Sequence, residues 1–122
     1  MTYFKAIDKK KHFAWMEKCL LCWEAAEECI TECITTGKNL SCCNICRDCA
    51  EMCALCIKFE AQQSTFFEQL CRVCADMCEA CAAECDKYSQ DSIAWKNCAD
   101  ACRVCAAACR ETADKNEKEA KR

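Results

Sequence analysis

Residues 71–85 read CRVCADMCEACAAEC, with cysteines spaced three, four, three and four residues apart. Positions separated by three or four residues lie on one face of an α-helix, whereas a strand would require a period of two. The stretch therefore predicts a helix with a line of thiols along one face, which we term a seam.

The same rhythm recurs in three other stretches of the chain. In the first of these, Ala26 fills the one vacant place on the seam. Cys43 directly follows Cys42 and so lies about 100° around the helix, at the edge of its seam. The seam cysteines outside residues 71–85 are Cys19, Cys22, Cys29, Cys33, Cys42, Cys46, Cys49, Cys53, Cys56, Cys98, Cys102, Cys105 and Cys109. Four independent runs of this kind predict four helices.

The breaks between these runs contain residues that typically begin or end helices. Gly37, the only glycine, can adopt the left-handed conformation that ends a helix. Asn39 or Ser41 can then cap the next helix. Thr65 and Glu68 have the spacing of a capping box, in which hydroxyl and carboxylate satisfy free amides at a helix start.

The predicted fold is all-α, an antiparallel up-down-up-down four-helix bundle with a cysteine-lined core. Short connections favour antiparallel neighbours, and residues 89–92 supply the last turn and cap. A chain of 122 residues fits one domain, 1–122. We expect helices near residues 8–36, 41–61, 65–88 and 92–114, and a charged, frayed tail at 115–122.

The charge balance and the lack of long apolar runs exclude several classes of binding partner. There are 17 Lys and Arg against 20 Asp and Glu, a formal charge of −3, so we expect neither nucleic acid nor an anionic membrane as partner. No stretch is long and apolar enough for a membrane span, and the residues after Met1 do not resemble a signal peptide. If Met1 is native, we expect a cytoplasmic protein, where structural disulfides are rare.

The 19 cysteines predict binding of a soft metal. Thiolates favour Cu(I), Zn and Fe–S clusters over hard cations. Side chains one helical turn apart are about 5–6 Å apart at Cβ, which suits a low-coordinate ion such as Cu(I) held between two sulfurs. Since buried bare thiolates would be costly, the empty core should hold neutral thiols that release protons as copper binds. A core in which so many cysteines serve only as small apolar residues is the weaker reading.

Two other metal chemistries remain alternatives. Cys43, Cys46, Cys49 and Cys53 match the spacing of a bacterial ferredoxin run, so an iron–sulfur electron-transfer protein is the second hypothesis. The usual following proline is absent, and the same cysteines continue a helical ladder. A zinc or cadmium buffer is the third hypothesis. No catalytic constellation is present, and a reactive-cysteine enzyme would need one distinct thiol beside a base, so we expect no enzyme.

The two ends of the predicted bundle differ. Antiparallel order brings four aromatic residues together as a plug at one end: Trp15, Phe59, Phe66 and Phe67. His12 continues the first seam at this end and is expected to cap it rather than to bind metal. The opposite end gathers Cys33, Cys42, Cys43, Cys85 and Cys98, with Tyr88 and Trp95 in position to close it partly, and we expect metal to enter there.

With these motifs, the chain resembles the bacterial copper storage proteins, which are four-helix bundles that hold many Cu(I) ions. The likeness is sharpest in residues 71–85 and in the spacing of residues 98–109. It implies thiolate ligation by the seam cysteines (Cys71, Cys74, Cys78, Cys81 and Cys85 among them), assembly into a homo-oligomer, and the cytosolic branch of the family. Copper would then be exchanged with a copper chaperone or low-molecular-weight thiols.

Overall fold

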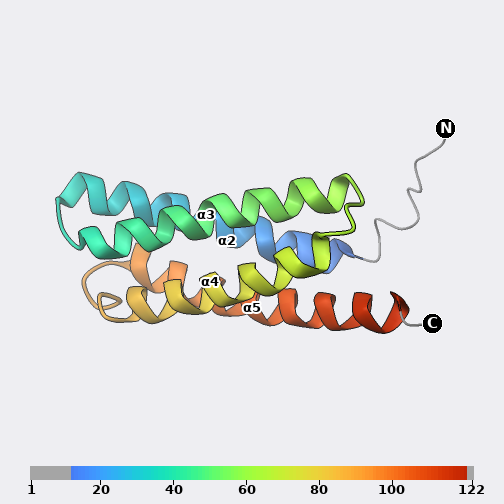
Figure 1. Ribbon diagram of the computed structural model, residues 1–122. Coiled ribbons are helices and arrows are strands. Elements are labelled where there is room, and N and C mark those ends of the chain that lie inside the picture. The colour runs from blue at the N-terminus through green and yellow to red at the C-terminus, as the bar shows by residue number, and fades with distance from the viewer. Residues whose placement is uncertain (1–11, 121–122) are drawn as a thin grey trace.

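The computed structural model describes residues 12–120, which form four helices joined by short connections (Figure 1). The predicted start of the first helix at residue 8 lies outside the described residues. The helices are α2 (Phe13–Thr36), α3 (Leu40–Ala61), α4 (Phe67–Asp86) and α5 (Ile93–Ala120). The all-α fold predicted from the seams is confirmed.

The helices run antiparallel to their neighbours and close into a ring. Helix α2 packs against α3 and α5, and α4 packs against the same two helices. The α2–α3 and α4–α5 connections lie together at one end, and the α3–α4 connection lies at the other end (Figure 1). We call the first the open end and the second the plugged end. No helix among the described residues has the length and apolar character needed to cross a bilayer.

Gly37 ends α2 as predicted. Its φ of 68° is left-handed, and its N–H donates to the Cys33 carbonyl at 2.9 Å. Asn39 occupies the position before α3 with a φ of 59°, but its side chain makes no capping hydrogen bond. Ser92 does cap the last helix, since its hydroxyl accepts the Ala94 N–H at 3.2 Å.

The predicted capping box at Thr65 and Glu68 is wrong. Helix α4 begins at Phe67, and no side chain makes a capping hydrogen bond there. Instead, the Ser64 hydroxyl accepts the Phe66 N–H at 3.0 Å, and the Ser64 carbonyl accepts the Phe67 N–H at 3.2 Å. The tight turn after α3 thus uses Ser64, rather than Thr65 and Glu68, to accept N–H groups at the start of α4.

The last helix does not end near residue 114 as predicted, because α5 continues to Ala120. Two features hold this extension. Ala113 is buried, and Arg72 of α4 contacts Asp114 at 3.2 Å and Glu117 at 2.8 Å. The charge of this segment predicted that it would be solvated, but Asp114 and Glu117 pair with an arginine of the neighbouring helix.

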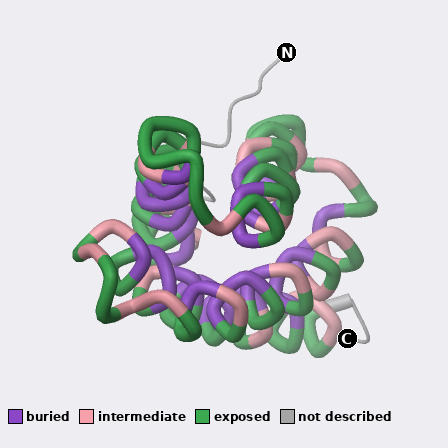
Figure 2. The backbone as a smooth tube through the Cα atoms, turned by 90° about the vertical axis from the view of Figure 1, so that its left-hand side faces the viewer, coloured by how far each residue is buried: buried purple, intermediate pink, exposed green. Residues whose placement is uncertain are grey.

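The core is built from the seams. Figure 2 shows that the buried residues of every helix lie on its inward side and the exposed residues on its outward side. Cysteine and alanine make up most of the buried residues, and the large buried side chains, Trp15, Phe67 and Trp95, come from the helix ends. The middle of the bundle is therefore a column of thiols between two aromatic ends.

Candidate metal centre: a column of thiols

All 19 cysteines are buried, and all are free thiols. Eighteen are 0–1% exposed, whereas Cys43 is 8% exposed. Cys43 is therefore buried as well, although its position predicted only the edge of a seam. No disulfide constrains the column among the described residues, so each sulfur is chemically available to a metal ion.

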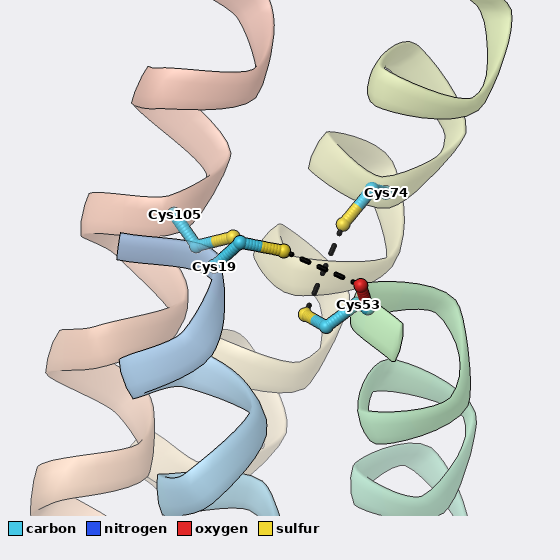
Figure 3. Close-up of side chains that lie close together, drawn as sticks. All are labelled: Cys19, Cys53, Cys74 and Cys105. Atoms are coloured by element: carbon cyan, nitrogen blue, oxygen red, sulfur yellow. Dashed lines mark hydrogen bonds between the residues drawn. The ribbon is translucent and has the colours of Figure 1, made fainter. Parts of the chain in front are cut away.

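In the middle of the bundle the sulfurs form layers in which each helix contributes one cysteine. One layer consists of Cys19, Cys53, Cys74 and Cys105, whose sulfur atoms lie within 4.8 Å of one another. Figure 3 shows these four side chains converging from the four helices, with the Cys53 and Cys74 sulfurs 3.9 Å apart. A metal–thiolate bond is about 2.3 Å for zinc, so sulfurs at this spacing can share one ion.

The next layer repeats this arrangement one helical turn towards the open end. The Cys22 sulfur lies 3.7 Å from that of Cys49 and 3.7 Å from that of Cys102. Cys78 completes the layer, with its sulfur 3.6 Å from that of Cys49. The layers follow from the 3-4 steps, which keep each seam inward over successive turns.

Cys46 has the largest number of close sulfur neighbours. Its sulfur lies 3.3 Å from Cys29, 3.6 Å from Cys81 and 3.7 Å from Cys85. Cys98 is also near, at 3.9 Å. The α2 seam has Ala26, fully buried, where a cysteine would otherwise stand.

At the open end, the sulfurs of Cys29, Cys33 and Cys42 lie within 4.8 Å of one another. Trp95 is 1% exposed there, and Tyr88 packs on it with ring centroids 6.2 Å apart. Cys43, the most exposed of the thiols, belongs to this end. The two aromatic rings predicted at this end therefore pack against each other.

The plugged end differs in part from the prediction. Trp15 and Phe67 are buried and pack edge to face, with centroids 5.0 Å apart. Phe59 is half-buried at the margin of the core. Phe66, however, is 59% exposed and is not part of the plug, since it lies in the turn just before α4 begins at Phe67.

A polar layer lies outside the aromatic one. His12 stacks on Phe67 with centroids 5.2 Å apart. Its Nδ1 lies 3.1 Å from Glu60 Oε2, and its Nε2 lies 3.3 Å from Asn116 Oδ1. With both nitrogens engaged, His12 ties α3 to α5, in line with its predicted role as an end cap.

Glu60 and Asn116 were missed by sequence reasoning, although a signal existed for both. Glu60 is 6% exposed and stands four residues after Cys56, on the continuation of the α3 seam. Asn116 stands seven residues after Cys109 on the α5 seam. Extending each seam past its last cysteine would have placed both residues at the plugged end.

Burial and thiol contacts control the proton affinity of the column. Burial raises the pKa of Cys33 from its ordinary 9.0 to about 11. Hydrogen bonding to Cys105, with burial, holds the pKa of Cys53 far above its usual range. Hydrogen bonds from Cys102 instead lower the pKa of Cys49. A metal ion bound between these sulfurs offsets the repulsion that neighbouring thiolates would exert on one another.

The ferredoxin-like run does not form one site. Within the described residues, Cys46 lies with Cys29, Cys85 and Cys98, whereas Cys49 lies with Cys22 and Cys102. Cys53 belongs to the layer of Figure 3. The spacing arises from overlapping seam steps, because a cluster site would need these cysteines to converge on one point.

Comparison with known proteins bears on this column of thiols. The sequence profile of the copper storage protein family matches residues 8–114. This chain belongs to the copper storage protein family. The identification agrees with the resemblance drawn from the cysteine spacing.

Solved copper storage proteins share the fold. The apo form of copper storage protein 3 from Bacillus subtilis is 40% identical, with a TM-score of 0.78 over 84% of this chain and 98% of that one. The Cu(I)-bound copper storage protein BsCsp3 is 39% identical, with a TM-score of 0.79 over 84% and 97%. A curated relative, the uncharacterized cysteine-rich protein YhjQ of Bacillus subtilis (strain 168), is 40% identical over 64% of this chain and 75% of its own length.

Proposed function

We propose that this protein stores Cu(I), with the cysteine seams as ligands and the whole chain acting as one storage unit. The observation that carries the proposal is the layering of free thiols from all four helices, with sulfurs within 4.8 Å of one another. Such a column supplies soft, low-coordinate sites at many levels and no single open catalytic position. The protein holds an ion rather than transforming a substrate.

Copper is favoured over the alternatives by chemistry and geometry together. Structural zinc takes four ligands in a separate tetrahedral set, whereas here Cys46 and its neighbours connect successive layers. A shared network suits thiolates that bridge several monovalent ions. Each Cu(I) that replaces an S–H proton leaves the net charge of the buried column unchanged.

An anaerobic titration with Cu(I) against a chromophoric chelator tests the proposal. Storage predicts binding that continues until the copper count approaches the 19 thiols. As a matched pair, one variant has serine at Cys22, Cys49, Cys78 and Cys102, and a control has serine at four exposed alanine or threonine positions. Capacity should fall in the first variant only. Saturation at a few ions, or a coloured protein with iron and inorganic sulfide, would refute storage.

We also propose that copper enters at the open end. This end holds the most exposed thiol, Cys43, beside a group of three sulfurs that can receive an ion from it. The donor is a copper chaperone or a low-molecular-weight thiol, since ligand exchange between thiolates transfers Cu(I) without releasing it. Stopped-flow loading of Cys43→Ser against wild type tests this route.

Nineteen free thiols remain reduced in the cytoplasm, and we propose that location and a homo-oligomeric state. Phe13, Leu20 and Ile34 support the oligomer, since they are 61%, 45% and 69% exposed on one outer stripe of α2. Sedimentation analysis of wild type and Leu20→Glu tests the assembly: a lower mass for the variant supports it, and a monomeric wild type refutes it.

A further inference from the structure

Two tryptophans continue the cysteine seams past their last thiols. Trp15 stands four residues before Cys19 on α2, and Trp95 stands three residues before Cys98 on α5. Both are almost fully buried, at 2% and 1% exposure. The third tryptophan, Trp23, lies off the seam, and its N–H donates to Glu27 on the surface at 3.1 Å.

At the plugged end, the indole of Trp15 acts as a donor to a core sulfur. Its Nε1 lies 3.2 Å from Cys109 Sγ. An indole N–H can only donate, so Cys109 is the acceptor. The edge-to-face contact with Phe67 holds the ring in this orientation.

At the open end, the indole N–H of Trp95 has no acceptor among the described residues. The Nε1 atom is buried. Buried donors are nearly always paired because desolvation without a bond is costly. Burial raises the pKa of the Cys33 thiol, and an interaction with the Trp95 indole opposes that rise.

Copper loading changes these sulfurs as acceptors. When Cu(I) binds, the S–H bond breaks, the proton leaves to solvent and the thiolate pair binds the metal. The sulfur keeps partial negative charge, and hydrogen bonds to charged acceptors are shorter and stronger than neutral ones. Donors to ligand atoms are also known to orient ligands and tune affinity at metal sites.

We propose that Trp15 and Trp95 are positioning residues that donate N–H hydrogen bonds to copper-bound thiolates at the two ends of the column. Trp15 bonds Cys109 already in the empty protein. Trp95 bonds Cys33 only once copper has bound there. The proposal rests on the storage function, and it gives each end of the column a built-in donor that the middle layers lack.

Indole N–H resonances test the proposal directly. The protein carries three tryptophans, so a ¹⁵N-labelled sample gives three indole signals, assigned with Trp15→Phe, Trp23→Phe and Trp95→Phe. On Cu(I) loading, the Trp95 proton should move downfield and exchange more slowly with solvent, whereas the Trp23 signal should not move. A Trp95 signal that keeps its shift and exchange rate in the fully loaded protein overturns the proposal.

Copper retention gives a second readout. Phenylalanine keeps an aromatic ring, although a smaller one, and removes the indole N–H. Trp15→Phe and Trp95→Phe should therefore hold their weakest ions about fivefold less tightly against a chelator, the effect of one net hydrogen bond of about 1 kcal/mol. Trp23→Phe is the matched control. Total capacity reports separately on storage: full capacity with unchanged retention in both variants refutes the donor role alone, whereas lost capacity in wild type refutes storage itself.

Discussion

Cys46 and Cys43 show how differently two nearby thiols are placed. The Cys46 sulfur lies within 3.7 Å of three others, while Cys43 lies at the margin of the open end and is 8% exposed. Each serine substitution removes one sulfur. A comparison of the two variants therefore separates the effect of a thiol's position from the effect of the number of thiols. We predict that Cys46→Ser loses more than one ion of capacity, because a shared thiolate serves several ions.

Cys43→Ser should keep nearly full capacity and load more slowly. Chelator titration gives the capacity, and stopped-flow absorbance gives the rate. Equal capacity losses in the two variants would contradict the bridging role of Cys46, and equal rates for Cys43→Ser and wild type would contradict access through Cys43.

Cys33 carries a prediction about pH. Burial raises its pKa from 9.0 to about 11 in the folded protein, so the folded state holds the proton more tightly than the unfolded chain does. The resulting stabilisation is complete below pH 9 and is lost as the pH rises towards 11. We predict that the empty, reduced protein loses stability across this window, and that Cys33→Ala flattens the slope. Urea unfolding under anaerobic reductant at pH 7, 9 and 10.5 measures it; a stability that rises with pH there would disprove it.

At the scale of the helices, periodic positions were predictable, whereas only some of the helix ends were. The 3-4 steps determine which face of each helix is buried, and Gly37 marks the end of α2 because only a left-handed residue fits there. The capping box at Thr65 failed because α4 begins only at Phe67 and Ser64, one residue before Thr65, accepts the Phe66 N–H instead. Local patterns cannot rank two competing caps, since the geometry of the turn decides between them.

The candidate site shows the same division. The seams predicted the buried thiols, and extending them would have found Glu60 and Asn116. The partners across the bundle, such as the Cys46 sulfur against those of Cys29 and Cys85, depend on how the four helices align along their axes. That alignment arises from packing between helices and leaves no trace in one helix's spacing.

The length of α5 likewise depends on contacts with a neighbouring helix. Arg72 bonds Asp114 and Glu117 from the neighbouring helix, and we predict that Arg72→Met frays the helix beyond Asp114. Exposed ion pairs contribute little, so the loss of unfolding free energy should be about 0.5–1 kcal/mol, with copper capacity unchanged. Amide hydrogen exchange locates the fraying, and Arg47→Met, exposed on α3, is the control. Equal protection of residues 114–120 in both variants would contradict this account.

At the scale of the whole molecule, the bundle folds around thiols that pack well without metal. Cysteine and alanine fill the core, and buried cysteine behaves as a small apolar residue when protonated. The polar and aromatic layers at the plugged end, with the ion pairs between α4 and α5, add contacts that involve no copper ligand except Cys109. The fold therefore precedes loading, unlike a zinc finger, whose folding requires its metal.

This order leads to a prediction for copper removal. Anaerobic extraction of copper with a strong chelator should leave the far-ultraviolet helical signal unchanged, because the helices do not depend on the ions. The unfolding temperature should fall on extraction and return on reloading, since a ligand that binds only the folded state stabilises it by RT ln(1 + [L]/Kd) per site. Circular dichroism melts of the loaded, extracted and reloaded protein measure both quantities. Loss of helix on extraction would mean that copper holds the bundle together, and a melting temperature indifferent to copper would mean that the ions bind outside the packed column.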